Sequence, residues 1–279
     1  MLTREQIDKV VWMALEEDAP FGDITSQTLV PETAVADADL VAREPGVFSG
    51  GEVFAVAMTT LDDTVKVTLH VADGDHFDKG AVLASVSGPA RILLRAERVA
   101  LNLVQRMTGI ATLTATYVAA VEGSKARVVD TRKTTPGLRA LERHAVRSGG
   151  GHNHRFSLSD AVMAKDNHLA LIDDLTAALK RARVDLPHTT HIEVEVDRLE
   201  QLDAVLAAGV DTIMLDNFSL DDLRKGVEMI GDRAIVEASG GIALDTIAEV
   251  AKTGVDVISV GALTHSVRAL DLGLDISVR

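Results

Sequence analysis

The chain of 279 residues contains no cysteine, which excludes disulfide bonds and thiolate metal ligands. Aromatic residues make up only 3% of the sequence, so Val, Leu, Ile and Ala must form most of the core. No apolar run approaches the roughly 18 residues of a membrane span. The N-terminal stretch, which reads Met-Leu-Thr-Arg-Glu-Gln, lacks the apolar core of a signal peptide. We therefore expect a cytoplasmic protein with no membrane partner.

Basic residues are also fewer than acidic ones, 28 against 42, so the chain carries a net charge of −14. This acidic balance argues against nucleic acid as a partner. Residues 125–165 are the exception: nine Lys and Arg residues against three acidic ones give this segment +6 and leave −20 for the remainder. A cationic segment in an acidic protein indicates an anionic ligand.

The N-terminal part has the pattern of a small mixed domain. Residues 3–17 predict an amphipathic helix that begins with a capping box formed by Thr3 and Gln6. The segments that follow predict three strands and one helix, at 36–43, 65–71 and 81–87 for the strands and 51–61 for the helix. This part resembles a lipoyl-type barrel-sandwich hybrid. We favour a plain scaffold over a carrier domain, because Lys79 lies in an ordinary Lys-Gly turn.

From Pro89 to Val121 the spacing of apolar residues predicts helix, with Gly109 dividing it into two. Beyond that point, short apolar strands alternate with helices such as 199–208 and 244–252. The predicted strands are 126–129, 161–164, 191–196, 211–215, 234–238 and 256–260. This alternation predicts a parallel sheet of the β/α barrel type. Six strands are fewer than eight, so we expect an α/β protein with an open, incomplete barrel.

Polar or glycine residues follow every one of these strands, and in β/α barrels the strand ends converge on the active site. Two consecutive strands end in glycine turns that favour phosphate binding, since glycine lets backbone N–H groups approach the anion and the next helix adds a positive dipole. These turns comprise Ser239, Gly240 and Gly241, and Val260, Gly261 and Ala262.

The cations near the other strand ends suit further negative charge on the ligand. They are Arg132, Lys133, Arg155 and Lys165, with His154 as a hydrogen-bond donor. A zinc site at His154 is disfavoured, because the other histidines are dispersed and there is no cysteine. Three further arginines are interpreted as the surface of a helix, namely Arg139, Arg143 and Arg147.

Two carboxylates near the ends of separate strands, Glu195 and Asp216, either bind Mg²⁺ or stabilise a developing positive charge. Glu193 leaves its strand on the same face as Glu195, two residues earlier. We choose Glu195 for the site because only Glu195 is near the end of the strand.

Several ordered motifs together resemble the quinolinate phosphoribosyltransferase family over nearly the whole chain. They include Glu-Arg-Val-Ala-Leu-Asn at 97–102, Asp-Thr-Arg-Lys-Thr-Thr-Pro-Gly at 130–137, Gly-Gly-Gly-His-Asn-His-Arg at 149–155, Lys-Asp-Asn-His at 165–168 and Glu-Ala-Ser-Gly-Gly-Ile at 237–242. No essential position departs from the family pattern.

The resemblance implies an N-terminal α/β sandwich domain at 1–108, an open barrel at 109–263, and a tail at 264–279 that returns to the first domain. It implies a homodimer, with a hexamer as the open alternative, in which Arg98 reaches the partner's site. The implied reaction joins quinolinate and phosphoribosyl pyrophosphate with Mg²⁺, giving nicotinate mononucleotide, pyrophosphate and CO₂.

The resemblance also implies a division of the site residues. Quinolinate would meet Arg98, Arg132, His154, Arg155 and Lys165. Phosphoribosyl pyrophosphate and Mg²⁺ would meet Lys133, Glu195 and Asp216, with the 5-phosphate on the two glycine turns. Two other functions remain open at this point: a related phosphoribosyltransferase with another substrate, and a non-catalytic binding module.

Overall fold

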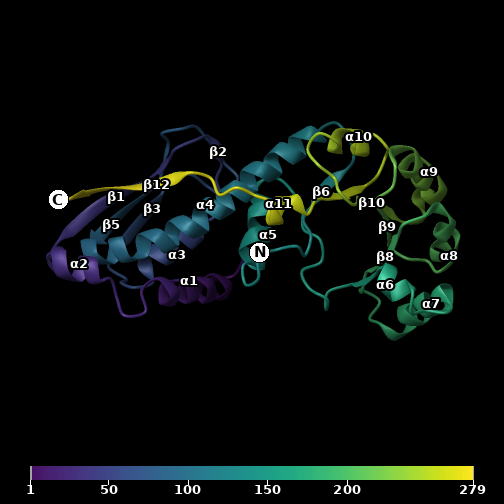
Figure 1. Cartoon of the computed structure of the whole chain (residues 1–279), viewed down its shortest axis with the longest axis horizontal. Helices are drawn as coiled ribbons and strands as arrows, with labels where there is room; N and C mark the ends of the chain where they lie inside the picture. The colour runs from purple at the N-terminus through teal and green to yellow at the C-terminus, as the bar shows by residue number, and fades with distance from the viewer. Residues whose placement is uncertain (1, 279) are drawn as a thin grey trace. The chain divides into compact units, whose positions relative to one another are not determined.

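The computed structural model describes residues 2–278, and contacts divide the chain into two compact units (Figure 1). The first comprises Met1–Ala115, Thr134–Gly150 and Leu263–Arg279, and the second comprises Thr116–Lys133 and Gly151–Ala262. This division differs from the sequence-based boundaries, because 134–150 joins the first unit. Within that unit the carboxylate of Glu142, which is 1% exposed, pairs with Arg106, so this segment is held by a buried ion pair.

The first unit is a sandwich of one antiparallel sheet and several helices. The strands lie in the order β12-β1-β5-β3. They span Leu272–Val278 for β12, Val35–Ala42 for β1, Val82–Pro89 for β5 and Lys66–Leu69 for β3. A small two-stranded sheet pairs β2 (Gly46–Val47) with β4 (His76–Phe77). Because β12 pairs with β1 over seven residues, the two ends of the chain share one sheet.

Helices α1 (Arg4–Asp18) and α3 (Gly51–Thr59) contact each other, and α3 also contacts β3. The capping box of Thr3 and Gln6 is present at the start of α1, and the four predicted segments of this unit are helix or strand as expected. Two of the few aromatic side chains, Phe48 and Phe54, are fully buried. A short helix, α2 (Ile24–Leu29), begins with Asp23 as its cap.

The second unit is built on a parallel sheet in the order β6-β11-β10-β9-β8-β7. The strands span Arg127–Val129, Val257–Ser259, Ile235–Ser239, Thr212–Asp216, Ile192–Val196 and Val162–Ala164 in that order. Each overlaps a strand predicted from sequence. Among the described residues the two outer strands, β6 and β7, do not pair with each other, so the barrel is open.

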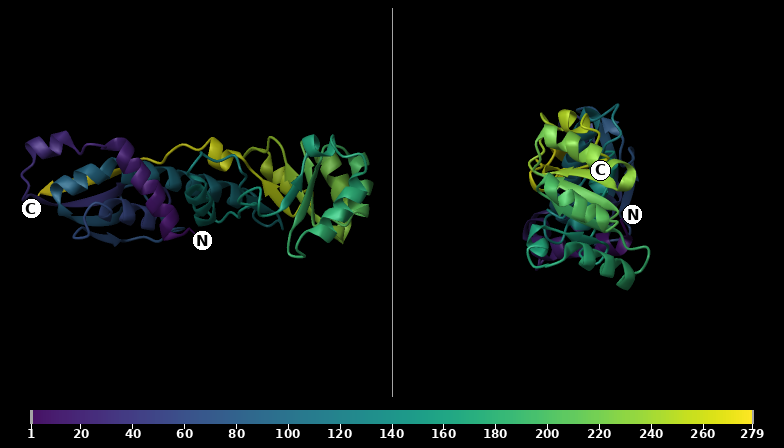
Figure 2. Two further views of the ribbon diagram at one scale, coloured as in Figure 1. Left: turned by 90° about the horizontal axis from the view of Figure 1, so that it is seen from below. Right: turned by 90° about the vertical axis from the view of Figure 1, so that its right-hand side faces the viewer.

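Successive helices contact one another along this sheet, as in the wall of a β/α barrel (Figure 2). The chain of contacts joins α7 (Leu175–Asp185), α8 (Leu202–Ala207), α9 (Leu220–Ile230) and α10 (Ile247–Ala251). Shorter helical segments are α6 (Asp166–Leu169), α11 (Ala262–His265), η1 (Leu199–Gln201) and η2 (Gly231–Arg233). Helix α5 (Arg139–Ser148) belongs to the first unit.

The prediction that Gly109 divides the central helix is wrong. Helix α4 is continuous from Ala90 to Ala120. A Cβ atom at Gly109 would lie 2.2 Å from the carbonyl oxygen of Arg268, so glycine is needed here for the close passage of another segment within the first unit. The glycine therefore reports a backbone contact, which a periodicity pattern cannot distinguish from a helix end.

We expect Gly109→Ala to destabilise the protein by about 2 kcal/mol, since the new methyl group must displace backbone rather than a flexible side chain. In an exposed helix position the same change would instead stabilise by up to about 1 kcal/mol. The measurement is urea unfolding followed by circular dichroism. The control is Ala119→Gly at an exposed position of the same helix, which should cost no more than about 1 kcal/mol. An unchanged or raised stability for Gly109→Ala would contradict this account.

Candidate active site

The register of the parallel sheet places several acidic side chains on one face. Glu195 of β8 and Glu237 of β10 both lie beside Met214 of β9, and Ser239 lies beside Asp216. Residues paired in this way point to the same side, and so do residues two apart on one strand. Glu193 therefore shares the face of Glu195. Three neighbouring strands thus present carboxylates to one side of the sheet.

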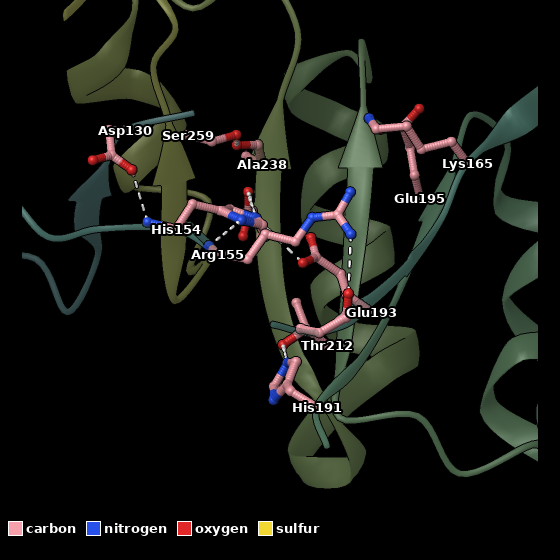
Figure 3. A network of polar contacts seen from close by, with 12 residues as sticks. Asp130, His154, Arg155, Lys165, His191, Glu193, Glu195, Thr212, Ala238 and Ser259 are labelled. Carbon is pink, nitrogen blue, oxygen red and sulfur yellow. Dashed lines mark hydrogen bonds and ion pairs between the residues drawn. The ribbon is translucent and has the colours of Figure 1, made fainter. Parts of the chain in front are cut away.

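Two cationic groups meet these carboxylates from outside the three strands. Lys165, at the end of β7, forms an ion pair between its Nζ and Oε2 of Glu195. His154, in the segment after α5, places its Nε2 3.2 Å from Oε2 of Glu193 and 3.6 Å from Oε1 of Glu237. Figure 3 shows the side chains of Lys165 and Glu195 side by side, and His154 and Arg155 beside Glu193. The negative charge on this face is therefore partly balanced by the protein itself.

The loop around His154 is held by β6 and by Asp130, the residue that follows β6. His152 forms a parallel bridge with Val129, and its backbone N–H donates to the carbonyl of Val128 at 2.8 Å. The carboxylate of Asp130 is fully buried and accepts hydrogen bonds from the backbone N–H of His154, at 2.8 Å, and from the side chain of Asn153. These two hydrogen bonds tie consecutive residues of the loop to the residue that follows β6. Asp130 therefore orients the loop.

Arg155 continues this network toward β7. Its backbone N–H donates to Nδ1 of His154 at 2.7 Å, and its Nη1 donates to the carbonyl of Ala161 at 3.0 Å. Because Nδ1 accepts a hydrogen bond, the proton of a neutral His154 lies on Nε2 and faces the buried carboxylates. Burial lowers the pKa of Arg155, as does the neighbouring charge of Arg132.

The buried carboxylates and the imidazole shift each other's protonation. Burial, reinforced by the charge of Glu193, raises the pKa of Glu237 to about 7. Burial alone would lower the pKa of His154. The hydrogen bond to Glu193 and the charges of Glu237 and Asp130 outweigh burial and raise that pKa above its usual value. His154 and Glu237 together therefore retain a proton near neutral pH.

The nitrogen of His154 and the carboxylate oxygens of Glu193 and Glu237 lie within 4.8 Å of one another, a spacing that would also suit a cation. A histidine–carboxylate hydrogen bond already accounts for the 3.2 Å contact to Glu193. We assign these contacts to hydrogen bonding and ion pairing. Glu195 and Asp216 offer a different set of oxygen atoms on adjacent strands, and oxygen donors are the ligands that Mg²⁺ prefers.

The glycine turn after β10 has the backbone that only glycine adopts easily. Gly240 has φ +94° and Gly241 has φ +57°. A Cβ atom at Gly240 would lie 2.2 Å from Oδ1 of Asn217 and 2.7 Å from its backbone nitrogen. Asn217, the residue after Asp216, therefore lies directly against this turn. Helix α10 begins at Ile247, three residues after the predicted start at 244, so several residues separate it from the Gly-Gly turn.

The turn after β11 is different, because helix α11 begins at Ala262, immediately after Gly261. Val260 is buried, while Gly261 and Ala262 are half-buried. The predicted cations Arg132 and Lys133 follow β6 and are exposed. Arg98 lies on α4 in the first unit and is also exposed.

The prediction that three arginines form a helix surface is only partly right. Arg147 is exposed on α5. Arg139 and Arg143 are half-buried, and Nε of Arg139 donates to the hydroxyl of Thr134 at 2.9 Å. Burial of these side chains depends on tertiary contacts that helical spacing alone does not reveal.

Sequence reasoning missed three acidic residues of the site: Asp130 as the loop anchor, and Glu193 and Glu237 as the partners of His154. A signal was available in the strand alternation. Glu193 is two residues from Glu195, and Glu237 is two residues from Ser239, so both share a face with a chosen residue. Glu193 contacts His154 although it lies further from the strand end than Glu195.

Two family models match the chain along most of its length. The quinolinate phosphoribosyl transferase N-terminal domain matches residues 23–108, and the C-terminal domain matches residues 110–275. The chain belongs to the quinolinate phosphoribosyltransferase family. No helix among residues 2–278 is long and apolar enough to cross a membrane.

Relatives of this family agree over nearly full length. The chain is 48% identical to the nicotinate-nucleotide pyrophosphorylase [carboxylating] of Mycobacterium leprae, with 94% of each chain covered. It is 44% identical to the probable enzyme of the same name from Bacillus subtilis, covering 98% of this chain and 94% of the other. The crystal structure of NadC from Streptococcus pyogenes superposes with a TM-score of 0.96 at 40% identity, covering 100% and 99% of the two chains.

We expect the stability of the protein to fall as pH rises from about 4.5 to about 7. The pKa of Glu237 is about 7 in the folded protein, against an ordinary value of 4.5. Its contribution to the free energy of unfolding is therefore fully present below pH 4.5 and is lost as the pH rises through about 7. The raised pKa of His154 acts in the same direction. Glu237→Gln should therefore flatten this dependence and be more stable than the wild type above pH 7, by about 1–3 kcal/mol.

Thermal unfolding of both proteins across pH 4.5–8 measures this difference. The exposed residue Glu228 on α9 provides the control, since Glu228→Gln removes a carboxylate from the same unit without touching the cluster. A Glu237→Gln curve parallel to that of the wild type would show that Glu237 does not titrate in this window.

Proposed function

We propose that this chain transfers the phosphoribosyl group of phosphoribosyl pyrophosphate to quinolinate with decarboxylation, giving nicotinate mononucleotide, pyrophosphate and CO₂ for NAD biosynthesis. The observation that most supports this is the face of the second unit on which Lys165, His154 and Arg155 meet Glu193, Glu195 and Glu237. Cations for a dicarboxylate and carboxylates for a developing cation are needed together in this reaction.

Quinolinate has two carboxylates, and the cationic groups suit them. Arg132 and Arg155 provide guanidinium forks that bind carboxylates in bidentate fashion, and Lys165 provides a point charge. Lys165 is already oriented by Glu195. His154 and Arg98 complete the set proposed for quinolinate. Binding would place the substrate against groups that are already ordered, so little rotational freedom is lost.

The second substrate suits the glycine turns and the carboxylates. The 5-phosphate fits the backbone of Ser239, Gly240 and Gly241 and that of Val260, Gly261 and Ala262, since glycine leaves room for an anion. Asp216 and Glu195 lie on the same face as Ser239. This shared face supports their assignment to the ribose and to Mg²⁺, which would neutralise pyrophosphate as it departs.

The chemistry follows from this division of charge. As pyrophosphate leaves, C1 of the ribose becomes oxocarbenium-like, and the carboxylates of Glu195 and Asp216 stabilise that positive charge. Lys133 stabilises the charge on the leaving group. The pyridinium nitrogen formed by attack on C1 then stabilises the electron pair that remains on C2 when the 2-carboxylate departs as CO₂, and a proton from solvent completes the C2–H bond of the product. Cations that bind the 2-carboxylate too tightly would oppose its departure as CO₂.

The proposal includes a homodimer, in which Arg98 completes the partner's site, and a cytoplasmic location. Arg98 is exposed on α4 in the first unit, so its guanidinium is available to another chain. A solvated helix charge is the alternative role for this residue.

The test of the activity is pyrophosphate release by the purified protein from phosphoribosyl pyrophosphate and quinolinate in the presence of Mg²⁺. Nicotinate and pyrimidine carboxylates, tried in place of quinolinate, separate this function from a related phosphoribosyltransferase. No pyrophosphate with any of these acids would favour a non-catalytic binding module.

Arg132→Ala should raise the KM for quinolinate about tenfold to a hundredfold, because one charge-assisted contact is lost. Glu195→Ala should mainly lower kcat, by about a hundredfold, because its charge acts in the transition state. Steady-state kinetics with each substrate varied in turn measure both effects. Arg147→Ala is the matched control, since it removes an exposed cation from the same basic segment. Equal effects in the control would contradict the assignment of Arg132.

Mixing Arg98→Ala with Arg132→Ala protein should restore part of the activity if sites are shared between subunits. In a mixed dimer one site then has both lesions and the other has neither, so up to about a quarter of wild-type activity returns when subunits exchange freely. The measurement is pyrophosphate release after co-incubation, compared with each variant alone. Absence of recovery, with mixed dimers detected by a mass tag, would contradict the shared site.

A further inference from the structure

Glu237 is an unusual residue for its position. It is 3% exposed on β10, and its Oε1 has no hydrogen-bond partner among residues 2–278. The same is true of Oε1 of Glu193, which is 4% exposed on β8. Burying an incompletely paired carboxylate is unfavourable, and two on one face are more so. Stability therefore does not explain why both side chains are acidic.

What the two carboxylates share is His154. Its Nε2 lies 3.2 Å from Oε2 of Glu193 and 3.6 Å from Oε1 of Glu237, so the ring is held between β8 and β10. Figure 3 shows the side chains of His154, Arg155 and Glu193 pointing toward one another. The opposite edge of the ring accepts the backbone N–H of Arg155 at 2.7 Å. A rotation of the imidazole would break both sets of contacts.

We propose that Glu237 is a positioning residue for the anion-binding pocket: together with Glu193 it fixes the imidazole of His154 and, through it, the backbone of Arg155. The proposal rests on the function proposed above, in which His154 and Arg155 meet quinolinate. Glu237 acts through these two residues and touches no substrate itself.

The charges around the cluster agree with this role. Glu193 faces Glu237 from β8, Lys165 from the end of β7, and the hydroxyl of Ser259 from β11, while Asp130 acts on His154 from the end of β6. The pKa values of Glu237 and His154 are both raised, which keeps a proton between them. Replacing Glu237 by an uncharged residue would weaken the attraction that positions the imidazole of His154, and it would also remove the cost of burying a carboxylate.

Glu237→Gln is therefore the decisive variant, since it keeps the volume and removes the charge. We expect the KM for quinolinate to rise about tenfold, with the KM for phosphoribosyl pyrophosphate within about twofold of wild type. The melting temperature should not fall. A structural role alone predicts the opposite combination: lower stability and equal effects on both substrates.

Two further variants keep the test sharp. Glu237→Asp retains the charge with a shorter reach and should recover part of the quinolinate KM. In a His154→Ala background, Glu237→Gln should add no more than about a twofold further change, because residues that act in series are not additive. Full additivity of the two changes, or a quinolinate KM unchanged in Glu237→Gln, would overturn the proposal. Glu228→Gln is the control for loss of one carboxylate.

Equilibrium binding separates this proposal from the proposed activity. Calorimetric titration of quinolinate into wild type and Glu237→Gln should show about tenfold weaker binding by the variant. A wild type that binds quinolinate but releases no pyrophosphate, with the variant binding more weakly, would refute the activity and support the positioning role. Equal binding by both proteins would refute the positioning role whatever the activity.

Discussion

The second unit depends on how its parallel strands place negative charge on one face of the sheet. The register aligns Glu195 and Glu237 with Met214 and puts Asp216 beside Ser239, so neighbouring strands concentrate carboxylates where an α/β sheet holds its ligand. Lys165 and His154 partly neutralise this charge. The face thus combines carboxylates with cations, and the proposed function rests on this combination.

Asp130 provides the link between the sheet and the cations. It is fully buried, and it fixes the loop of Asn153 and His154 by accepting hydrogen bonds from both. Arg155 then spans from this loop to Ala161, beside the start of β7. The loop of Asn153, His154 and Arg155 therefore lies across the open side of the barrel, between β6 and β7. An incomplete barrel leaves this side free for such a loop, whereas a closed one would fill it with strands.

The sequence predicted the parallel strands because they depend on local patterns. Short apolar runs located all six parallel strands, and Lys165, Glu195 and Asp216, which remain predictions for the site, lie at or next to the ends of three of them. The errors arose where tertiary contacts decide. The spacing of apolar residues predicted a helix break at Gly109, whereas the glycine leaves room for the carbonyl of Arg268. Glu193 was set aside for its depth, yet His154 reaches it from a distant segment.

The buried acids show why depth in a strand is a poor guide to function. A carboxylate at the rim can be solvated, so its presence there costs little and says little. Glu193 and Glu237 are almost fully buried, each with an oxygen that has no hydrogen-bond partner in the described part of the chain. Such residues destabilise the fold, and an apolar side chain of similar size at either position would avoid that cost. Their ion pairs with His154 offset part of the cost of burial. A buried charge is therefore more informative about the site than an exposed one.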